Sequence, residues 1–188
     1  MTAELSASPA PPRPTRVFVA LKMVPEVAQA LADIAEPLTK FGIRPIAPDD
    51  IHLTLVPPWN EAAVEQAAAK LTRAAKGHSG FALEFGRVGY GPEPKHPRYL
   101  WAECAVSQPL ATLRDALQLA FGQVDERLFL PHVTLARLRE AGARIARKCP
   151  IDRALALTQQ IATVELMQSP LPGERGYRVL ASVKLAAP

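Results

Sequence analysis

The sequence has few cysteines and no long apolar segment. Its 188 residues include 2 cysteines. Cys104 and Cys149 form no CxxC pair, so they indicate neither a zinc knuckle nor a disulfide framework. This cysteine usage is typical of a reducing compartment, and we expect a soluble cytoplasmic protein. No uninterrupted apolar run approaches the roughly 20 residues that cross a bilayer, so we expect no membrane partner.

The signatures of several other classes are also missing. The sequence contains no HExxH, no carboxylate-rich EF-hand loop and no GxxxxGK[ST]. Metalloprotease, calcium-binding and P-loop nucleotide functions are therefore without motif support. We predict a function that needs no metal and no cofactor.

The composition that is present describes a mildly basic globular protein. The formal net charge is +4 and the pI is about 9.3, a bias that favours anionic partners without identifying one. Residues 1–15 are rich in proline and lack the continuous apolar core of a signal peptide, so we predict a flexible tail there. Residues 16–188 are long enough to bury a core without disulfides or metal. We expect them to form a single domain that acts as a monomer.

Apolar periodicity predicts a mixture of strands and helices. Strands are expected over residues 16–23, 51–56, 81–90, 98–106, 127–138, 160–167 and 178–185, and helices over 26–41, 61–76 and 109–124. Pro37 should bend or shorten the first helix, and Pro57 and Pro58 should end the second strand. Several neighbouring strands have connections too short for a parallel crossover, which favours an α+β fold with largely antiparallel sheets.

Two nearly identical tetrapeptides indicate an internal duplication. They are His-Leu-Thr-Leu at 52–55 and His-Val-Thr-Leu at 132–135, each in an apolar strand. A repeated unit of this kind predicts two pseudo-symmetric lobes. We expect a bilobal molecule with helices outside and a central cleft, each lobe presenting one motif to the cleft.

The same tetrapeptides carry the candidate chemistry. Side chains alternate faces along a strand, so His52 lies beside Thr54 and His132 lies beside Thr134. Face to face, the two pairs supply a proton donor, a proton acceptor and two hydroxyls around a volume that suits a phosphate. A single HxT is more typical of a packed histidine, but two copies among 4 histidines favour a catalytic pair.

The order and spacing of these segments resemble the two-histidine phosphoesterases, specifically the bacterial and archaeal RNA 2′,3′-cyclic phosphodiesterases, also called 2′-5′ RNA ligases. The segments are RVFVAL, the helix starting at Pro25, IHLTL, LPHVTLAR and YRVLASVKL. The resemblance implies a bilobal fold and metal-independent hydrolysis of a terminal 2′,3′-cyclic phosphate to a 2′-phosphate. It also implies ATP-independent 2′-5′ ligation as a related reaction, with RNA bearing a 2′,3′-cyclic phosphate end as the partner.

The resemblance further implies roles for individual residues. His52 matches the family's proton donor and His132 its proton acceptor, while Thr54 and Thr134 match phosphate-binding hydroxyls. Arg137 matches an arginine that helps to hold the substrate. Strict alternation turns Arg137 away from His132, so this role requires a bulge or a strand end.

The chain departs from the family pattern after the first motif. Family members often carry an aromatic residue there that suits stacking on a base, whereas residues 56–58 are Val-Pro-Pro. Trp59 either takes over the stacking or packs beneath the proline loop. His96 either grips the RNA backbone or belongs to a plain surface loop, and His78 is expected to be solvated.

Two other functions stay open. One is hydrolysis of a different small cyclic phosphate, which a panel of substrates separates from the first. The other is a non-catalytic module that binds RNA ends. The intact HxT pairs argue against a pure binder, because binding alone needs no two opposed titratable groups.

Overall fold

The computed structural model describes residues 14–93, 95–124 and 128–187. Most of the predicted tail, residues 1–13, lies outside these residues. The first strand already begins at Thr15.

The described residues form one nine-stranded sheet whose strand pairs are antiparallel. The strands are β1 (Thr15–Lys22), β2 (Arg44–Pro45), β3 (His52–Glu61), β4 (Phe81–Gly91), β5 (Tyr99–Cys104), β6 (His132–Arg137), β7 (Arg153–Ile161), β8 (Thr163–Gln168) and β9 (Arg178–Lys184). The helices are α1 (Pro25–Ala35), α2 (Val64–Ala75), α3 (Gln108–Phe121) and α4 (Gly142–Lys148), with 3-10 turns η1 (Glu36–Phe41), η2 (Pro48–Asp50) and η3 (Arg139–Ala141). The predicted α+β class with antiparallel strands is confirmed.

The strand order divides the sheet into two similar halves. It runs β7-β4-β5-β6-β3-β1-β8-β9, with β2 added to β6. β1 and β3 are paired neighbours with α1 between them in sequence, and β5 and β6 repeat this arrangement with α3. The halves join where Leu53 of β3 pairs with Val133 of β6. The duplicated motifs therefore lie side by side at the centre of one continuous sheet.

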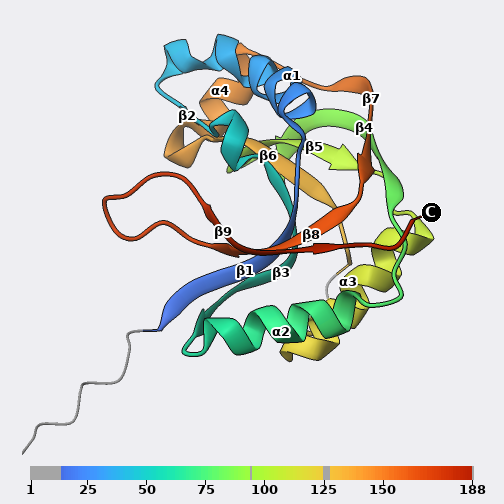
Figure 1. Cartoon of the computed structure of the whole chain (residues 1–188). Helices are drawn as coiled ribbons and strands as arrows, with labels where there is room; N and C mark the ends of the chain where they lie inside the picture. Colours follow the sequence, from blue (N-terminus) through green and yellow to red (C-terminus); the bar gives the residue numbers. More distant parts are fainter. Residues whose placement is uncertain (1–13, 94, 125–127, 188) are drawn as a thin grey trace, which may run out of the picture.

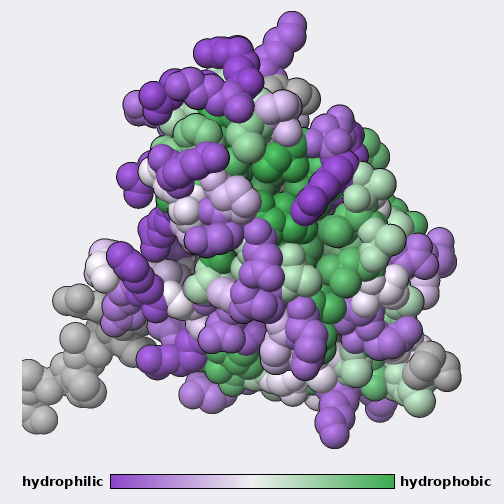
Figure 2. All heavy atoms as spheres, turned by 90° about the horizontal axis from the view of Figure 1, so that it is seen from above, coloured by the Kyte–Doolittle hydropathy of each residue, from purple (hydrophilic) through white to green (hydrophobic). Residues whose placement is uncertain are grey.

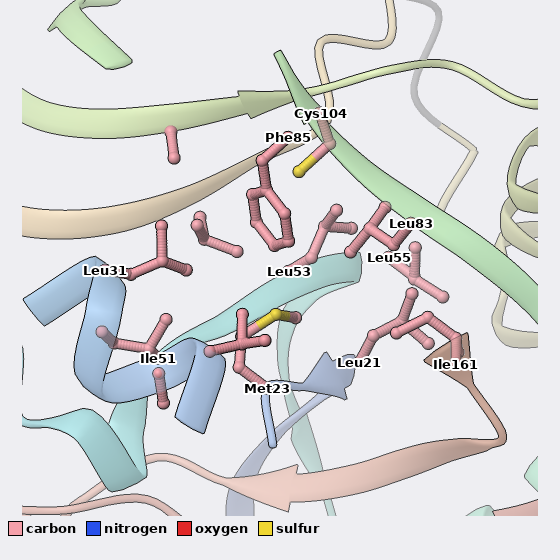
Figure 3. Packing of buried hydrophobic residues seen from close by; sticks show 14 of the residues in the cluster. Leu21, Met23, Leu31, Ile51, Leu53, Leu55, Leu83, Phe85, Cys104 and Ile161 are labelled. Carbon is pink, nitrogen blue, oxygen red and sulfur yellow. The ribbon is translucent and has the colours of Figure 1, made fainter. Parts of the chain in front are cut away.

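Helices flank the sheet at opposite ends of the molecule (Figure 1), with α1 and α4 at one end and α2 and α3 at the other. The helix-facing side of the sheet carries the main core, in which side chains of α1, β1, β3 and β4 meet (Figure 3). Leu21, Leu31 and Leu53 are fully buried there, and each such side chain stabilises the fold by about 1.5–3 kcal/mol. A smaller cluster of Phe18, Ala20 and Met167 lies apart from this core, with Tyr177 packed against it.

Local sequence signals set the ends of α3, which packs against β3. The Oγ of Ser107 accepts a hydrogen bond from the backbone N–H of Leu110 at 3.4 Å, which caps the first turn. Gly122 ends the helix in the left-handed conformation with φ 64°, which glycine adopts without strain. The buried Leu110, Leu113 and Leu117 follow the predicted spacing.

Pro37 has the predicted effect on the first helix. The α-helix ends at Ala35 and continues as the 3-10 turn η1, because proline lacks the N–H that an α-helix needs.

The prediction for the second strand is wrong at its end. β3 continues through Pro57 and Pro58 to Glu61. The prolines lie between Val56 and Trp59, where the register against β1 shifts. Proline is tolerated at such a bulge because the ladder of hydrogen bonds is already interrupted.

Two further strand predictions need correction. Of the strand expected over 127–138, only residues 132–137 are in β6, and residue 127 lies outside the described residues. The backbone oxygen of Pro131, just before β6, accepts a hydrogen bond from Cys104. The strand expected over 160–167 is divided at Ala162, so that its first two residues end β7 and the rest lie in β8. The remainder of β7 was not predicted, since residues 153–159 carry a weaker apolar pattern and are mostly exposed along one edge of the sheet.

Hydrophilic side chains cover most of the surface seen from the α1 end (Figure 2), with hydrophobic residues visible between them. Among the described helices, none has the length and apolar character that crossing a membrane requires.

Candidate active site

The two HxT motifs open onto one cavity. Leu53 and Val133 are fully buried, so the polar residues before and after them point to the opposite side of the sheet. There they meet in a cavity of about 550 Å³. Its walls are Arg16, Phe18, Ile46, Asp50, His52, Thr54, Pro58, Tyr99, His132, Thr134, Arg137, Ser169, Pro170 and Tyr177. All five residues singled out in the sequence for catalysis and substrate binding lie around it.

Both histidines are held in the same way. The Nδ1 of His52 lies 2.6 Å from the backbone oxygen of Asp50, and the Nδ1 of His132 lies 2.8 Å from the backbone oxygen of Leu130. A carbonyl only accepts hydrogen bonds, so each Nδ1 carries the hydrogen. The Nε2 of each ring is then the nitrogen left for a substrate. It accepts a proton when the ring is neutral and donates one when the ring is charged.

Aromatic rings pack against each imidazole. The ring centroid of His52 lies 4.9 Å from that of Phe18 and 4.9 Å from that of Tyr177. The centroid of His132 lies 4.3 Å from Trp101, which β5 places beside it. Rings at these separations are in packing contact. Both histidines therefore have their orientation fixed by a hydrogen bond and by ring packing.

Burial lowers the pKa of His52. The positive charges of Arg137 and Lys22 act in the same direction, while the backbone hydrogen bond to Asp50 and that residue's negative charge oppose them. The neutral imidazole is thus favoured before a substrate binds. A bound phosphate carries negative charge, which raises the pKa again.

A bulge turns Arg137 toward the cavity. Leu100 pairs with Ala136 and Trp101 with Thr134, so Leu135 is an extra residue in β6. Such an insertion changes the alternation of the side chains that follow it. Arg137 lines the same cavity as the two motifs, and its Nη2 donates a hydrogen bond to the Tyr177 hydroxyl at 3.2 Å.

Asp50 and Tyr177 were not identified as site residues from the sequence. Asp50 Oδ1 accepts a hydrogen bond from the backbone N–H of Tyr177 at 2.8 Å, while its backbone oxygen holds His52. One residue thus ties the loop between β8 and β9 to the first motif. Their sequence context gave little indication of a role in the site, because Asp50 belongs to a turn and Tyr177 to a proline- and glycine-rich loop.

The residues left open in the sequence lie elsewhere. Trp59 packs on Phe121, with ring centroids 4.8 Å apart, and its Nε1 donates to Glu61. It is absent from the cavity wall, so it is a packing residue. His96 is exposed and lies 3.8 Å from the Glu93 carboxylate, and it too lies away from the cavity. His78 is half-buried, so the expectation of a solvated side chain holds only in part.

In the part of the chain that the structure describes, no cluster of metal ligands accompanies the histidines, and the Cys104 thiol is buried. Within the described residues, no group of three or more His, Cys, Asp or Glu side chains is placed to hold a metal ion. Burial raises the pKa of the Cys104 thiol to about 12, with the nearby Glu103 charge acting in the same direction. That thiol therefore stays protonated and unreactive at neutral pH.

This chain is similar in sequence to known proteins. Residues 24–168 match the family model of the 2′-5′ RNA ligase superfamily. A Bacillus subtilis (strain 168) RNA 2′,3′-cyclic phosphodiesterase is 30% identical over 109 residues, which cover 54% of this chain and 58% of that protein. The match thus spans little more than half the length of that relative.

Solved structures share the fold. A Thermus thermophilus protein superposes with a TM-score of 0.76 at 24% identity, covering 92% of this chain and 98% of its own. LigT of E. coli, in its apo form, gives a TM-score of 0.71 at 22% identity, covering 93% and 99%. Because the family model spans most of the described chain, this protein belongs to the 2′-5′ RNA ligase superfamily.

Proposed function

We propose that this protein hydrolyses 2′,3′-cyclic phosphate ends of RNA to 2′-phosphate ends, with His52 and His132 as acid and base and without a metal. The observation that carries the proposal is the matched pair of imidazoles in one cavity, each with Nδ1 tied to a backbone carbonyl. The name of the Bacillus subtilis relative supports the same reaction. LigT of E. coli has been crystallised with 3′-AMP and with phosphate, ligands of the same chemical kind.

In the proposed reaction a water molecule attacks the phosphorus of the cyclic phosphate. His132 Nε2 takes the proton of that water as the new P–O bond forms. The bond from phosphorus to the ribose 3′ oxygen breaks, and His52 Nε2–H protonates the departing oxygen. The phosphate remains on the 2′ oxygen. One proton enters the protein at His132 and one leaves it at His52, so the total charge of the pair is unchanged, and exchange with solvent restores the starting protonation state of each ring.

The other cavity residues stabilise the phosphate. Charge increases on its free oxygens as the water adds, and the hydroxyls of Thr54 and Thr134 donate to them. The guanidinium of Arg137 adds a charged donor. Phosphate charge also offsets the burial of His52, so that His52 is protonated when the substrate is in place.

The same bond exchange accounts for ligation. With the 5′-hydroxyl of a second RNA in place of water, cleavage of the bond to the 3′ oxygen leaves a 2′-5′ linkage, and no ATP is consumed. Both activities would make this chain an RNA-processing protein, and we propose that it acts in the cytoplasm.

Steady-state turnover on an oligonucleotide with a 2′,3′-cyclic phosphate end tests the proposal. We expect a 2′-phosphate product. His52→Ala and His132→Ala should each lower turnover by about 10²–10⁴-fold, the usual contribution of one positioned proton-transfer group. His96→Ala serves as the matched control and should retain activity. The double variant should lose less than the product of the two factors, because the pair acts as a unit.

A substrate with sulfur in place of the 3′ oxygen tests the division of roles. Its thiolate leaves without needing a proton, so this substrate should largely rescue His52→Ala and leave His132→Ala slow. Rescue of the His132 variant instead reverses the two roles. No turnover by the wild-type protein on any cyclic-phosphate oligonucleotide contradicts the proposed function and favours a module that only binds RNA ends.

A further inference from the structure

A second cavity continues from the active site along the surface. It has a volume of about 720 Å³ and runs over β2 and the loop between β8 and β9, which extends on the same side of the molecule as β2 (Figure 1). Arg137, Asp50 and Tyr177 line both cavities. We call this second cavity the arginine groove, because its walls include Arg44, Arg137, Arg139 and Arg175.

Two of these arginines face each other across neighbouring strands. Arg44 of β2 is the register partner of Arg137 of β6, and like charges directly opposite each other in a sheet are destabilising. No carboxylate among the described residues forms an ion pair with any of the four guanidiniums. An anion lying between the arginines would relieve this repulsion.

The acidic residues of the groove do not supply that anion. Asp50 and Glu174 are its two carboxylates, and one oxygen of Asp50 is already used by the backbone N–H of Tyr177. Glu174 is exposed at the loop tip. The groove therefore keeps an excess of positive charge.

Arg139 adds a backbone feature that points to the same surface. Its φ is +51°, in the left-handed region where a side chain beyond glycine costs about 1–2 kcal/mol. It stands at the start of η3, two residues after the end of the strand that carries the second motif. Backbone strain of this kind is found most often at functional sites.

We propose that the arginine groove binds the phosphodiester backbone of RNA upstream of the terminal cyclic phosphate. Guanidinium groups bind phosphate through paired charged hydrogen bonds, and a groove that opens from the catalytic cavity holds the linkages next to the reacting end. The natural substrate is then an oligonucleotide end and not a mononucleoside cyclic phosphate. This inference rests on the proposed function.

Rates on substrates of increasing length test it. The kcat/KM of the wild-type protein should rise about 10–100-fold from adenosine 2′,3′-cyclic phosphate to a short oligomer with the same end, the range expected for charged hydrogen bonds to one phosphate. In the double variant Arg44→Ala, Arg139→Ala this gain should disappear, so that the rate on the oligomer falls toward the rate on the mononucleoside. Arg73→Ala on α2 is the matched control, since it removes an exposed arginine far from the groove, and should keep the gain.

A substrate with one uncharged linkage provides the same test without a variant. Replacing the upstream linkage by an uncharged methylphosphonate should remove the gain in the wild-type protein. Salt gives a second measure: for single strands the slope of log affinity against log salt is about −0.7 per phosphate contact, so the double variant, which loses its contact with that one phosphate, should show a slope that is shallower by about 0.7.

Two results separate this inference from the function on which it rests. Equal rates on mononucleoside and oligomer, or a gain that survives in the double variant and with the methylphosphonate, would overturn the arginine groove and leave the phosphodiesterase standing. If the wild-type protein opens neither substrate, the proposed function fails. In that case, binding of a fluorescent oligomer tests the groove by itself. Weaker binding by the double variant than by the wild-type protein supports the groove, and equal binding overturns it.

Discussion

Leu53 of β3 and Val133 of β6 are register partners, and each stands between the histidine and the threonine of its motif. Their side chains point into the main core and are fully buried. The polar residues on either side of each must therefore point the other way, into one cavity. A single backbone pairing at the centre of the sheet thus sets the relative position of both motifs.

Gly91→Ala should impair the second motif from a distance. A Cβ at Gly91 lies 2.1 Å from the Trp101 ring, which packs on His132. The ring must move, and we expect a loss of about 1–3 kcal/mol of stability, as for other overpacked cores, together with slower turnover. Denaturant unfolding and steady-state rates measure the two effects.

Gly86→Ala is the control for this substitution. Gly86 lies in the same strand, and a Cβ there meets no atom within 4 Å, so stability and turnover should change little. Equal behaviour of the two variants would show that Trp101 does not position His132.

Asp50→Asn should lower the pKa of His52. The negative charge of Asp50 is one of the effects that raise that pKa, whereas the amide oxygen of asparagine can still accept the hydrogen bond from Tyr177. An acid with a lower pKa is protonated in a smaller fraction of molecules, so kcat/KM near neutral pH should fall. NMR titration of the His52 ring measures the pKa directly.

The direction of that rate change distinguishes the roles of the histidines. If His52 were the base, a lower pKa would leave it neutral at pH 7, and kcat/KM would stay the same or rise. For the wild-type protein, the rate should rise and then fall with increasing pH, because one histidine must be neutral and the other charged.

Activity should survive strong chelation. In the proposed mechanism, side chains of the cavity supply the acid, the base and the hydroxyl donors, so dialysis against EDTA should leave turnover unchanged. Complete loss of activity, restored by one divalent ion, would contradict the two-histidine mechanism.

Arg139→Gly should be more stable than Arg139→Ala. Glycine adopts the left-handed conformation of residue 139 without the steric cost that alanine shares with arginine, a difference of about 1 kcal/mol. Arg73→Gly, inside α2, should show the opposite sign and lose about 0.5–1 kcal/mol relative to Arg73→Ala. Thermal unfolding of the four variants measures both differences, and equal stability at position 139 would mean that the backbone there is unstrained.

The central part of the site could be predicted because strand periodicity is simple. Alternation alone puts each histidine beside its threonine, and two copies of one tetrapeptide indicate two equivalent positions. For Arg137 the same rule predicted the wrong face, and only the extra residue in β6 turns it inward. A sequence carries no direct mark of such a bulge.

The aromatic part of the site was hidden for a different reason. β1 is buried on both faces, so the alternation that would single out Phe18 is lost among apolar neighbours. Tyr177 comes from a loop that the hydrogen bond to Asp50 brings across the cavity, a contact between residues 127 positions apart. Trp59 attracted attention by its place in the sequence, yet it packs on Phe121 because β3 continues past the prolines.

The half of the sheet that holds β1 and β3 also contains the late strands β8 and β9, and this order determines when that half can be completed during synthesis. β1 pairs with β8, which ends at Gln168, and β4 pairs with β5 and β7. While the chain is being synthesised, the first motif leaves the ribosome about eighty residues before the second, and its sheet still lacks the strand that covers β1. The half of the sheet that carries the first motif is therefore completed only after β8 has emerged, and a nascent chain halted before that strand should bind no phosphate.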